Sequence, residues 1–250
     1  MTDSTRLFSL RSDRYAQFRP TYPDGLFRWL AERSPRTGLA IDVAAGSGQA
    51  TLPLLAHFDR VVACDASPQQ LIANTDWNTA LRFAARAEQL PLPDGLADAL
   101  VVAQALHWFA TPAFFAEAKR VLAPQGFFCA WCYSLLQIEP SVDAVITRLH
   151  GQTLDGHWPD GRASVDAGYR DISPPFETIP TPDFVIEASW DLSQLLGYLR
   201  TWSAVKHWQQ THGYDPVAVL EPELLELWGE PAVRRNVRWP LHFIAGYPGR

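Results

Sequence analysis

The most constraining feature of this 250-residue chain is a short apolar run, LAIDV at residues 39–43, that leads directly into AAGSGQ at residues 44–49. An apolar run followed at once by glycine is typical of a buried strand and a tight turn, where the missing side chain lets a ligand approach the backbone closely. A second apolar run, at residues 61–65, ends on Asp65. An acid at the tip of the second strand of a βαβ unit is well placed to accept from both ribose hydroxyls. The pattern predicts a crevice for a nucleotide-like cofactor.

Strand and helix patterns alternate through the first half of the chain. Strands are predicted at residues 39–43, 61–65, 81–85, 99–103 and 126–132. Helices are predicted at residues 22–33, 49–58, 67–76 and 111–122. Ser67 before Pro68 is a typical helix start, since a hydroxyl caps the helix and proline is tolerated at its first position. This alternation predicts a doubly wound α/β fold with the ligand crevice at the carboxyl ends of the strands.

The pattern changes after Tyr133. Residues 134–182 carry clusters of Gly, Pro and Asp around a short helical stretch at 141–151, which indicates a cap inserted after the fifth strand. Strand patterns at 184–190 and 236–245 bring the expected sheet to seven mostly parallel strands. Leucines and aromatic residues recur at helical spacing between 192 and 210, which predicts one amphipathic helix.

We therefore expect one domain over residues 1–250. Its parts are a cofactor-covering segment at 1–36, a cofactor-binding core at 37–133, and a substrate cap at 134–182 with parts of 191–235. The net charge of −6 argues against nucleic acid as a partner, because phosphate binding needs clustered Lys and Arg. No apolar run is long enough to span a membrane. Three cysteines and an N-terminus without a signal-peptide pattern predict a cytoplasmic protein, whose oligomeric state the sequence leaves open.

Several motifs in order resemble one family. Residues 42–49 and then Asp65-Ala66-Ser67 resemble the first two motifs of class I S-adenosylmethionine-dependent methyltransferases. The similarity to the type-11 methyltransferase domain covers residues 10–133 and continues through residues 87–91, Asp98, 104–109, Glu117 and 119–126. Segments at 15–23, 197–203 and 239–241 resemble a subgroup similar to trans-aconitate methyltransferases. The resemblance implies a Rossmann-like methyltransferase fold.

The resemblance also implies S-adenosylmethionine as cofactor and S-adenosylhomocysteine as product. Gly46 and Gly48 would admit the methionine part, while Asp42 would orient the loop or bond the ammonium group. Asp65 would accept from the ribose hydroxyls. The remaining cofactor-binding residues that it implies are Tyr15, Arg19, Ala44, Ala66, Ala87, Glu88 and Gln104.

Two residues depart from the family pattern. Ala44 stands where the family usually has its first glycine, and its methyl group is tolerable there if φ is negative. Arg86 stands where many relatives have an acid that contacts the adenine, so that contact would pass to Glu88. Neither change removes the acid expected at the ribose, Asp65.

The acceptor is expected to be a small molecule, methylated on an oxygen of a carboxylate or hydroxyl. A carboxylate needs no general base, whereas a phenol or amine would benefit from one. His107 is the candidate catalytic base, and a structural histidine is an equal interpretation. The acceptor-pocket candidates are Trp108, Trp131, Tyr133, Trp202 and Lys206. His150 and His157 are spaced too loosely for a dependable metal site, so no metal is expected.

Two other functions stay open from the sequence. A nicotinamide-dependent oxidoreductase would need a third glycine or alanine where Thr51 stands. A methyltransferase-fold protein that binds cofactor without transferring a methyl group is suggested by Ala44 and Arg86. An acidic acceptor would need cations in the cap, such as Arg162 and Arg200, whereas an apolar acceptor would use its tryptophans.

Overall fold

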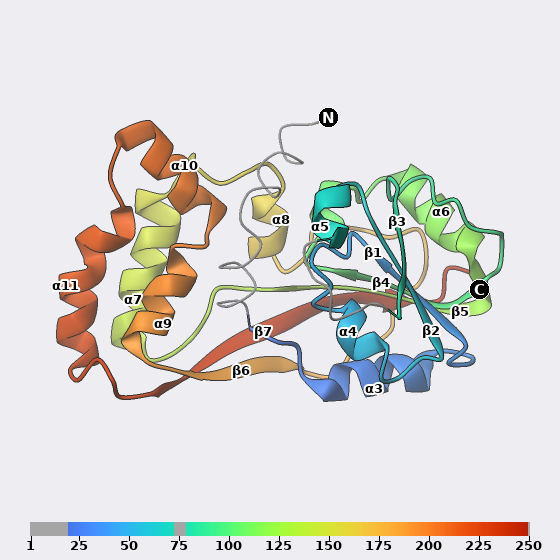
Figure 1. The fold of residues 1–250 in the computed structure, drawn as a ribbon, viewed down its shortest axis with the longest axis horizontal. Helices are drawn as coiled ribbons and strands as arrows, with labels where there is room; N and C mark the ends of the chain where they lie inside the picture. Colours follow the sequence, from blue (N-terminus) through green and yellow to red (C-terminus); the bar gives the residue numbers. More distant parts are fainter. Residues whose placement is uncertain (1–19, 73–78, 250) are drawn as a thin grey trace.

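The computed structural model describes residues 20–72 and 79–249. Within them, seven strands form one sheet in the order β3-β2-β1-β4-β5-β7-β6 (Figure 1). The strands are β1 (Leu39–Val43), β2 (Arg60–Asp65), β3 (Leu81–Ala84), β4 (Ala97–Ala103), β5 (Leu122–Tyr133), β6 (Val185–Trp190) and β7 (Arg235–Gly246). Strands β1 to β5 pair in parallel, and β7 is antiparallel to both β5 and β6. The predicted doubly wound, seven-stranded fold is confirmed.

Helices cover both faces of the sheet. The helices of the first half are α3 (Asp24–Arg33), α4 (Thr51–Leu54), α5 (Pro68–Ile72) and α6 (Pro112–Val121). Buried side chains of α3, α4 and α5 share one hydrophobic cluster with alternate strand residues such as Ala40 and Val61. Those of α6 share a second cluster with the intervening residues, such as Ile41 and Val62. Successive strand residues point to opposite faces, so every strand of the centre feeds both cores.

Two predicted helices differ from the structure in extent. The helix expected at 49–58 is regular only over α4, because Pro53 has no N–H to donate and the chain continues in turns. Those turns tighten to i→i−3 bonds, with Ala56 N–H donating to the Pro53 carbonyl at 3.1 Å. The helix expected at 67–76 begins at α5, and its last residues lie outside the described part of the chain.

The second half of the chain builds a helical lobe beyond one end of the sheet (Figure 1). Its helices are α7 (Pro140–Arg148), a π-helical turn (Leu149–Thr153), α8 (Arg162–Asp166), α9 (Leu192–Leu199), α10 (Ser203–His212) and α11 (Pro216–Trp228). The buried residues of α7, α9, α10 and α11 continue the cluster that α3 to α5 make with the sheet. One apolar core therefore joins this lobe to the central sheet.

The single helix predicted at 192–210 is wrong, since the chain breaks between α9 and α10. Thr201 donates its hydroxyl to the Tyr198 carbonyl at 2.6 Å, which ends α9. Trp202 then adopts an extended backbone with ψ 135° and buries its ring, so packing of one tryptophan overrides the helical spacing. Helix α11, which the sequence analysis did not predict, follows with Asp215 as its cap.

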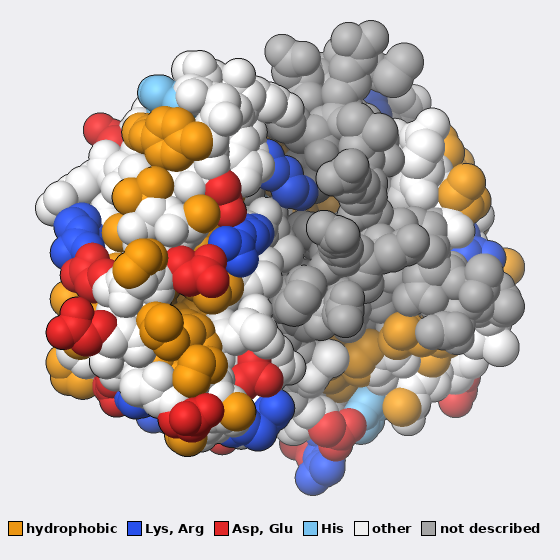
Figure 2. Space-filling model, turned by 60° about the vertical axis from the view of Figure 1, so that its left-hand side comes forward, with side chains coloured by type: hydrophobic (Ala, Val, Ile, Leu, Met, Phe, Trp, Pro, Cys, Tyr) orange, Lys and Arg blue, Asp and Glu red, His pale blue; other side chains and the backbone are white. Residues whose placement is uncertain are grey.

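The outer face of the lobe is mixed in character. Figure 2 shows apolar side chains there, interrupted by acidic and basic ones. Val219 and Leu225 of α11 are exposed, and an ion pair between Arg148 and Glu223 ties α11 to α7. None of the described helices is both long and apolar enough to cross a membrane.

Candidate active site

A cavity of about 690 Å³ opens where β1, β2 and β4 end. Its volume is in the usual range of small-molecule sites, and the carboxyl ends of parallel strands are where such folds bind ligands. The cofactor residues expected from the sequence that line it are Ala44, Gly46, Asp65, Ala66, Ala87, Glu88 and Gln104. Trp108 and Tyr133, expected at the acceptor, line it too. Residues from several separate segments thus share one cavity.

Asp65 holds the first loop in place from the tip of β2. Its Oδ2 accepts from the Gly46 N–H at 2.9 Å and its Oδ1 accepts from the Ser67 N–H at 2.8 Å. Burial raises the pKa of this carboxyl, and the two N–H donors oppose that rise. A carboxylate has about four acceptor positions, so these two bonds leave capacity for further donors. Asp65 therefore fixes the loop and still presents acceptor sites to the cavity.

The loop itself turns through left-handed backbone conformations. Gly46 has φ 55° and Gly48 has φ 87°, which explains why glycine occupies both positions. Gly48 is absent from the cavity wall, so its part is conformational. Ala44 also has a positive φ, 58°, so the condition of a negative φ expected from the sequence is not met. The alanine in place of the family's glycine is accommodated with backbone strain.

Asp42 lies behind the cavity wall rather than in it. Its carboxyl is fully buried and accepts from the Thr51 hydroxyl at 2.5 Å, which ties β1 to the start of α4. Its Oδ1 is buried with no hydrogen-bond partner among the described residues. Burial raises the pKa of Asp42 to about 7, against the opposing hydrogen bond from Thr51. The structure thus gives Asp42 a loop-orienting place, with one acceptor oxygen unused.

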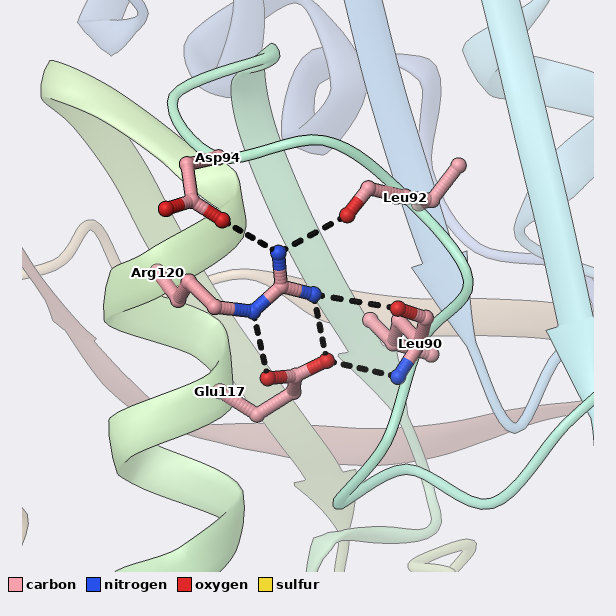
Figure 3. Close-up of polar contacts among 5 residues, drawn as sticks. All are labelled: Leu90, Leu92, Asp94, Glu117 and Arg120. Carbon is pink, nitrogen blue, oxygen red and sulfur yellow. Dashed lines mark hydrogen bonds and ion pairs between the residues drawn. The ribbon is translucent and has the colours of Figure 1, made fainter.

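A separate network fixes the loop between β3 and β4 to helix α6 (Figure 3). The Arg120 guanidinium donates to both oxygens of Glu117, at 2.7 and 2.8 Å, and to the carbonyls of Leu90 and Leu92, at 3.0 and 2.8 Å. It also pairs with Asp94, and Glu117 in turn accepts from the Leu90 N–H at 2.6 Å. This clamp follows directly after Ala87 and Glu88 in the chain, so it holds the segment that forms the cavity's far wall.

The acidic side chains outside the cavity have structural partners. Asp98 is buried and accepts from the N–H groups of Gly38 and Leu39, at 3.0 and 3.1 Å, where β1 begins. At the cavity, the Arg86 side chain lies 3.6 Å from the Glu88 carboxylate. Both Arg86 and Glu88 line the cavity, so the departure from the family pattern at Arg86 is paired with the acid expected to replace it.

Gln104 closes the cavity beneath the ends of β4 and β5. Its backbone is left-handed, with φ 61°, and its N–H donates to the Trp131 carbonyl at 2.8 Å. The Gln104 side-chain oxygen accepts from the Tyr133 N–H at 2.8 Å. Gln104 therefore fixes the two strand ends relative to each other at the point where Tyr133 and Trp108 line the cavity.

His107 lies in the short 3-10 helix Leu106–Trp108 and is absent from the cavity wall, although its neighbours Ala105 and Trp108 form part of it. Its Nδ1 is 3.3 Å from the Tyr169 hydroxyl. Burial, together with the charge of Arg162, lowers the pKa of His107 to about 4. The imidazole is therefore neutral at pH 7.

The other acceptor-pocket candidates lie away from this cavity. Trp131 is fully buried and packs edge-on against Tyr22, a residue of the cavity wall, at 5.5 Å between ring centroids. Trp202 packs in the lobe against Trp158, at 5.5 Å, and Lys206 follows it on α10. Tyr15 and Arg19, expected to cover the cofactor, lie outside the described residues.

Sequence reasoning missed several residues of the site. Tyr22, Gln70 and Phe109 line the cavity, and Tyr169 contacts His107. Tyr22 lies just before a predicted helix and Gln70 within one, so their places next to a strand end could have been found from the topology. Tyr169 comes from the cap and carried no such signal. No cluster of three described His, Cys, Asp or Glu side chains is arranged to hold a metal ion.

Comparisons with known proteins agree with this geometry. The family described as a methyltransferase domain matches residues 41–130. A Dictyostelium discoideum protein described as a methyltransferase is 34% identical over 227 residues, which cover 88% of this chain and 86% of the relative. An uncharacterised methyltransferase of Mycobacterium tuberculosis is 33% identical over 125 residues, covering 50% of this chain and 51% of the relative.

Solved structures show the same relationship. One described as a type II methyltransferase from Anaeromyxobacter dehalogenans is 40% identical, with a TM-score of 0.86, and covers 92% of this chain and 98% of that one. The sheet order and the loop before Asp65 are those of the class I methyltransferase fold. The chain belongs to the S-adenosylmethionine-dependent methyltransferases and is an enzyme of that family. The narrower resemblance to trans-aconitate methyltransferases stays a prediction.

Proposed function

We propose that the cavity binds S-adenosylmethionine and that the enzyme transfers its methyl group to an oxygen of a small-molecule acceptor, a carboxylate or a hydroxyl. The observation that carries this proposal is Asp65. It stands at the tip of β2, lines the cavity and has its two oxygens oriented by backbone N–H groups. Acceptor capacity that remains on a fixed carboxylate suits the paired hydroxyls of a ribose.

The residues present fit the cofactor. Asp65 would hold the ribose, and Ala66 with Ala87 would offer small apolar contacts to the adenine. Gly46 gives an approach to the loop backbone, since a Cβ built there would meet nothing within 4 Å. The buried, unpartnered Oδ1 of Asp42 would favour the ammonium group, directly or through water. A carboxyl whose pKa is raised to about 7 gains most from a nearby cation.

The cofactor, when bound, supplies a methyl group on a positively charged sulfur and leaves as S-adenosylhomocysteine. The protein's part is alignment of the acceptor and removal of water. Tyr22, Trp108 and Tyr133 form an aromatic wall for this purpose. Gln104 fixes Tyr133 relative to the end of β4 through the hydrogen bond to its N–H.

The cap would supply the rest of the acceptor site. Arg162 of α8 stacks on Trp158, 4.3 Å from the ring centroid, and pairs with Asp166. Arg200 pairs with Asp215 and Glu221. These cations already have acidic partners within the cap. We place the acceptor at the aromatic wall, with no metal, nucleic acid or membrane involved, in a cytoplasmic enzyme.

Calorimetry with S-adenosylmethionine tests the first half of the proposal. We expect saturable binding with one cofactor per chain, and S-adenosylhomocysteine should compete for the same site. Incubation with a panel of small carboxylates, hydroxy compounds and amines tests the second half, read by release of S-adenosylhomocysteine. Turnover with carboxylates or hydroxy compounds supports methylation on oxygen. Turnover confined to amines, or an absence of cofactor binding, contradicts it.

A further inference from the structure

Three residues grip His107 from the cap side. Tyr169 places its hydroxyl 3.3 Å from Nδ1. Gly161, in a left-handed turn with φ 81°, lies so close that a Cβ built on it would stand 3.1 Å from Cδ2 of the imidazole. Arg162, the next residue, brings its positive charge near the ring. The ring is therefore held on one edge by a hydroxyl and on another by backbone, which leaves it little freedom to turn.

The hydrogen bonds of Tyr169 decide which nitrogen of His107 carries the proton. Tyr169 is buried, with 1% of its surface exposed, and the backbone N–H groups of Leu106 and His107 hydrogen bond to its oxygen. An oxygen that accepts from two N–H groups must find an acceptor for its own proton, because an unpaired buried hydroxyl is costly. The one acceptor that faces it is Nδ1 of His107.

A neutral imidazole carries one proton, and an Nδ1 that accepts from Tyr169 places that proton on Nε2. Among the described residues Nε2 has no hydrogen-bond partner. The same 3-10 helix contributes Trp108 to the cavity wall. We infer that Tyr169 is a positioning residue that fixes His107 as the Nε2–H tautomer, so that His107 donates a hydrogen bond to the methyl acceptor and does not act as its base.

This inference rests on the proposed function and narrows its acceptor class to an anionic oxygen, a carboxylate above all. One carboxylate oxygen would accept from Nε2–H while the other attacks the methyl carbon. The attacking oxygen's lone pair forms the C–O bond, and the electron pair of the C–S bond stays on sulfur. No proton has to be removed, so a site without a base is sufficient. A neutral phenol or amine would need a basic nitrogen that Tyr169 has already occupied.

The strained backbone of Tyr169 supports a positioning role. Tyr169 has φ 61°, which is unfavourable for a bulky residue, and its N–H donates to the Ser164 carbonyl at 2.8 Å. A left-handed tyrosine persists only where surrounding contacts fix it, and such positions cluster at functional sites. Its hydroxyl contacts the very turn that follows β4, so the cap and the central sheet meet at the His107 ring.

Nitrogen-15 NMR of the histidine rings tests the tautomer without any turnover. We expect Nδ1 of His107 to be unprotonated and Nε2 protonated in the wild-type enzyme, with the signals assigned by their loss in His107→Gln. Tyr169→Phe should shift the ring towards a mixture of tautomers. Tyr198→Phe is the matched control, because it removes a different buried hydroxyl, which lies 3.3 Å from Trp239 Nε1, and should leave His107 unchanged. A proton on Nδ1 in the wild type would overturn the inference, whatever Tyr169→Phe does.

Activity with a carboxylate acceptor gives the second readout. The amide of His107→Gln can still donate but cannot take a proton, so its kcat should stay within about tenfold of the wild type. His107→Leu removes the donor and should lose roughly 10- to 100-fold. Equal losses in both variants would mean a base and contradict the inference. Cofactor calorimetry on the same samples separates this outcome from a failure of the proposed function, which would abolish binding in the wild type.

Discussion

The two halves of the molecule build their parts of the site in different ways. Around the first loop, the geometry is made by backbone: left-handed turns at Gly46 and Gly48, and N–H groups that orient Asp65. In the cap, the geometry is made by side chains, such as the stacked Trp158 and Arg162 and the contact of Tyr169 with His107. The comparison teaches that the backbone-made half is suited to a fixed ligand, whereas the side-chain half is free to differ in its acceptor.

Asp65→Ala should produce the largest effect in the backbone-made half. It removes the proposed acceptor of the ribose hydroxyls together with the partner of the Gly46 and Ser67 N–H groups. We expect cofactor affinity to fall by roughly 2–4 kcal/mol, about 30- to 1000-fold, measured by calorimetry.

Asp98→Asn is the matched control for that loss. Asp98 is also a buried acid that accepts from two backbone N–H groups, but it serves the start of β1 and lies outside the cavity. It should lower the melting temperature and leave the affinity of the folded protein unchanged. Equal losses of affinity in both variants would show that Asp65 acts through stability alone.

The clamp around Arg120 gives the next largest effect, on stability. Arg120→Met leaves Glu117 and the Leu90 and Leu92 carbonyls without their donor, so we expect the free energy of unfolding to fall by about 2 kcal/mol. Arg28→Met is the control, because the Arg28–Asp24 pair is exposed and should contribute almost nothing. Chemical denaturation measures both, and equal losses would argue against the clamp.

The same clamp has a defined dependence on pH. Hydrogen bonding from Arg120 holds the pKa of Glu117 below its usual value of 4.5. A lowered pKa in the folded state stabilises the protein above the unfolded value and is lost as the pH falls. The difference in stability between wild type and Arg120→Met should therefore shrink as the pH falls below about 4.5.

Ala44→Gly should give the smallest effect, and a favourable one. Glycine removes the strain of a left-handed alanine at φ 58°, so we expect a gain of about 1 kcal/mol in the free energy of unfolding. The neighbouring Ala45 has no positive φ, and Ala45→Gly should lose stability because glycine has more freedom to lose on folding. Thermal unfolding of the two variants should move in opposite directions, and a shared loss would refute the strain at Ala44.

The same comparison explains how far the sequence could predict the structure. Strand β1 was predicted to the residue, because a fully buried strand of a parallel sheet is a continuous apolar run. Asp65 and the glycine loop were predicted because local backbone requirements select particular residues. The break at Trp202, helix α11 and the contact of Tyr169 with His107 were not, since each depends on packing between segments far apart in the chain.

The crystal structure of the enzyme with S-adenosylhomocysteine would test the central claim most directly. The account predicts ligand density in the cavity between Gly46 and Gln104, with both ribose hydroxyls within hydrogen-bonding distance of the Asp65 carboxylate. Density elsewhere, or a ribose turned away from Asp65, would contradict it.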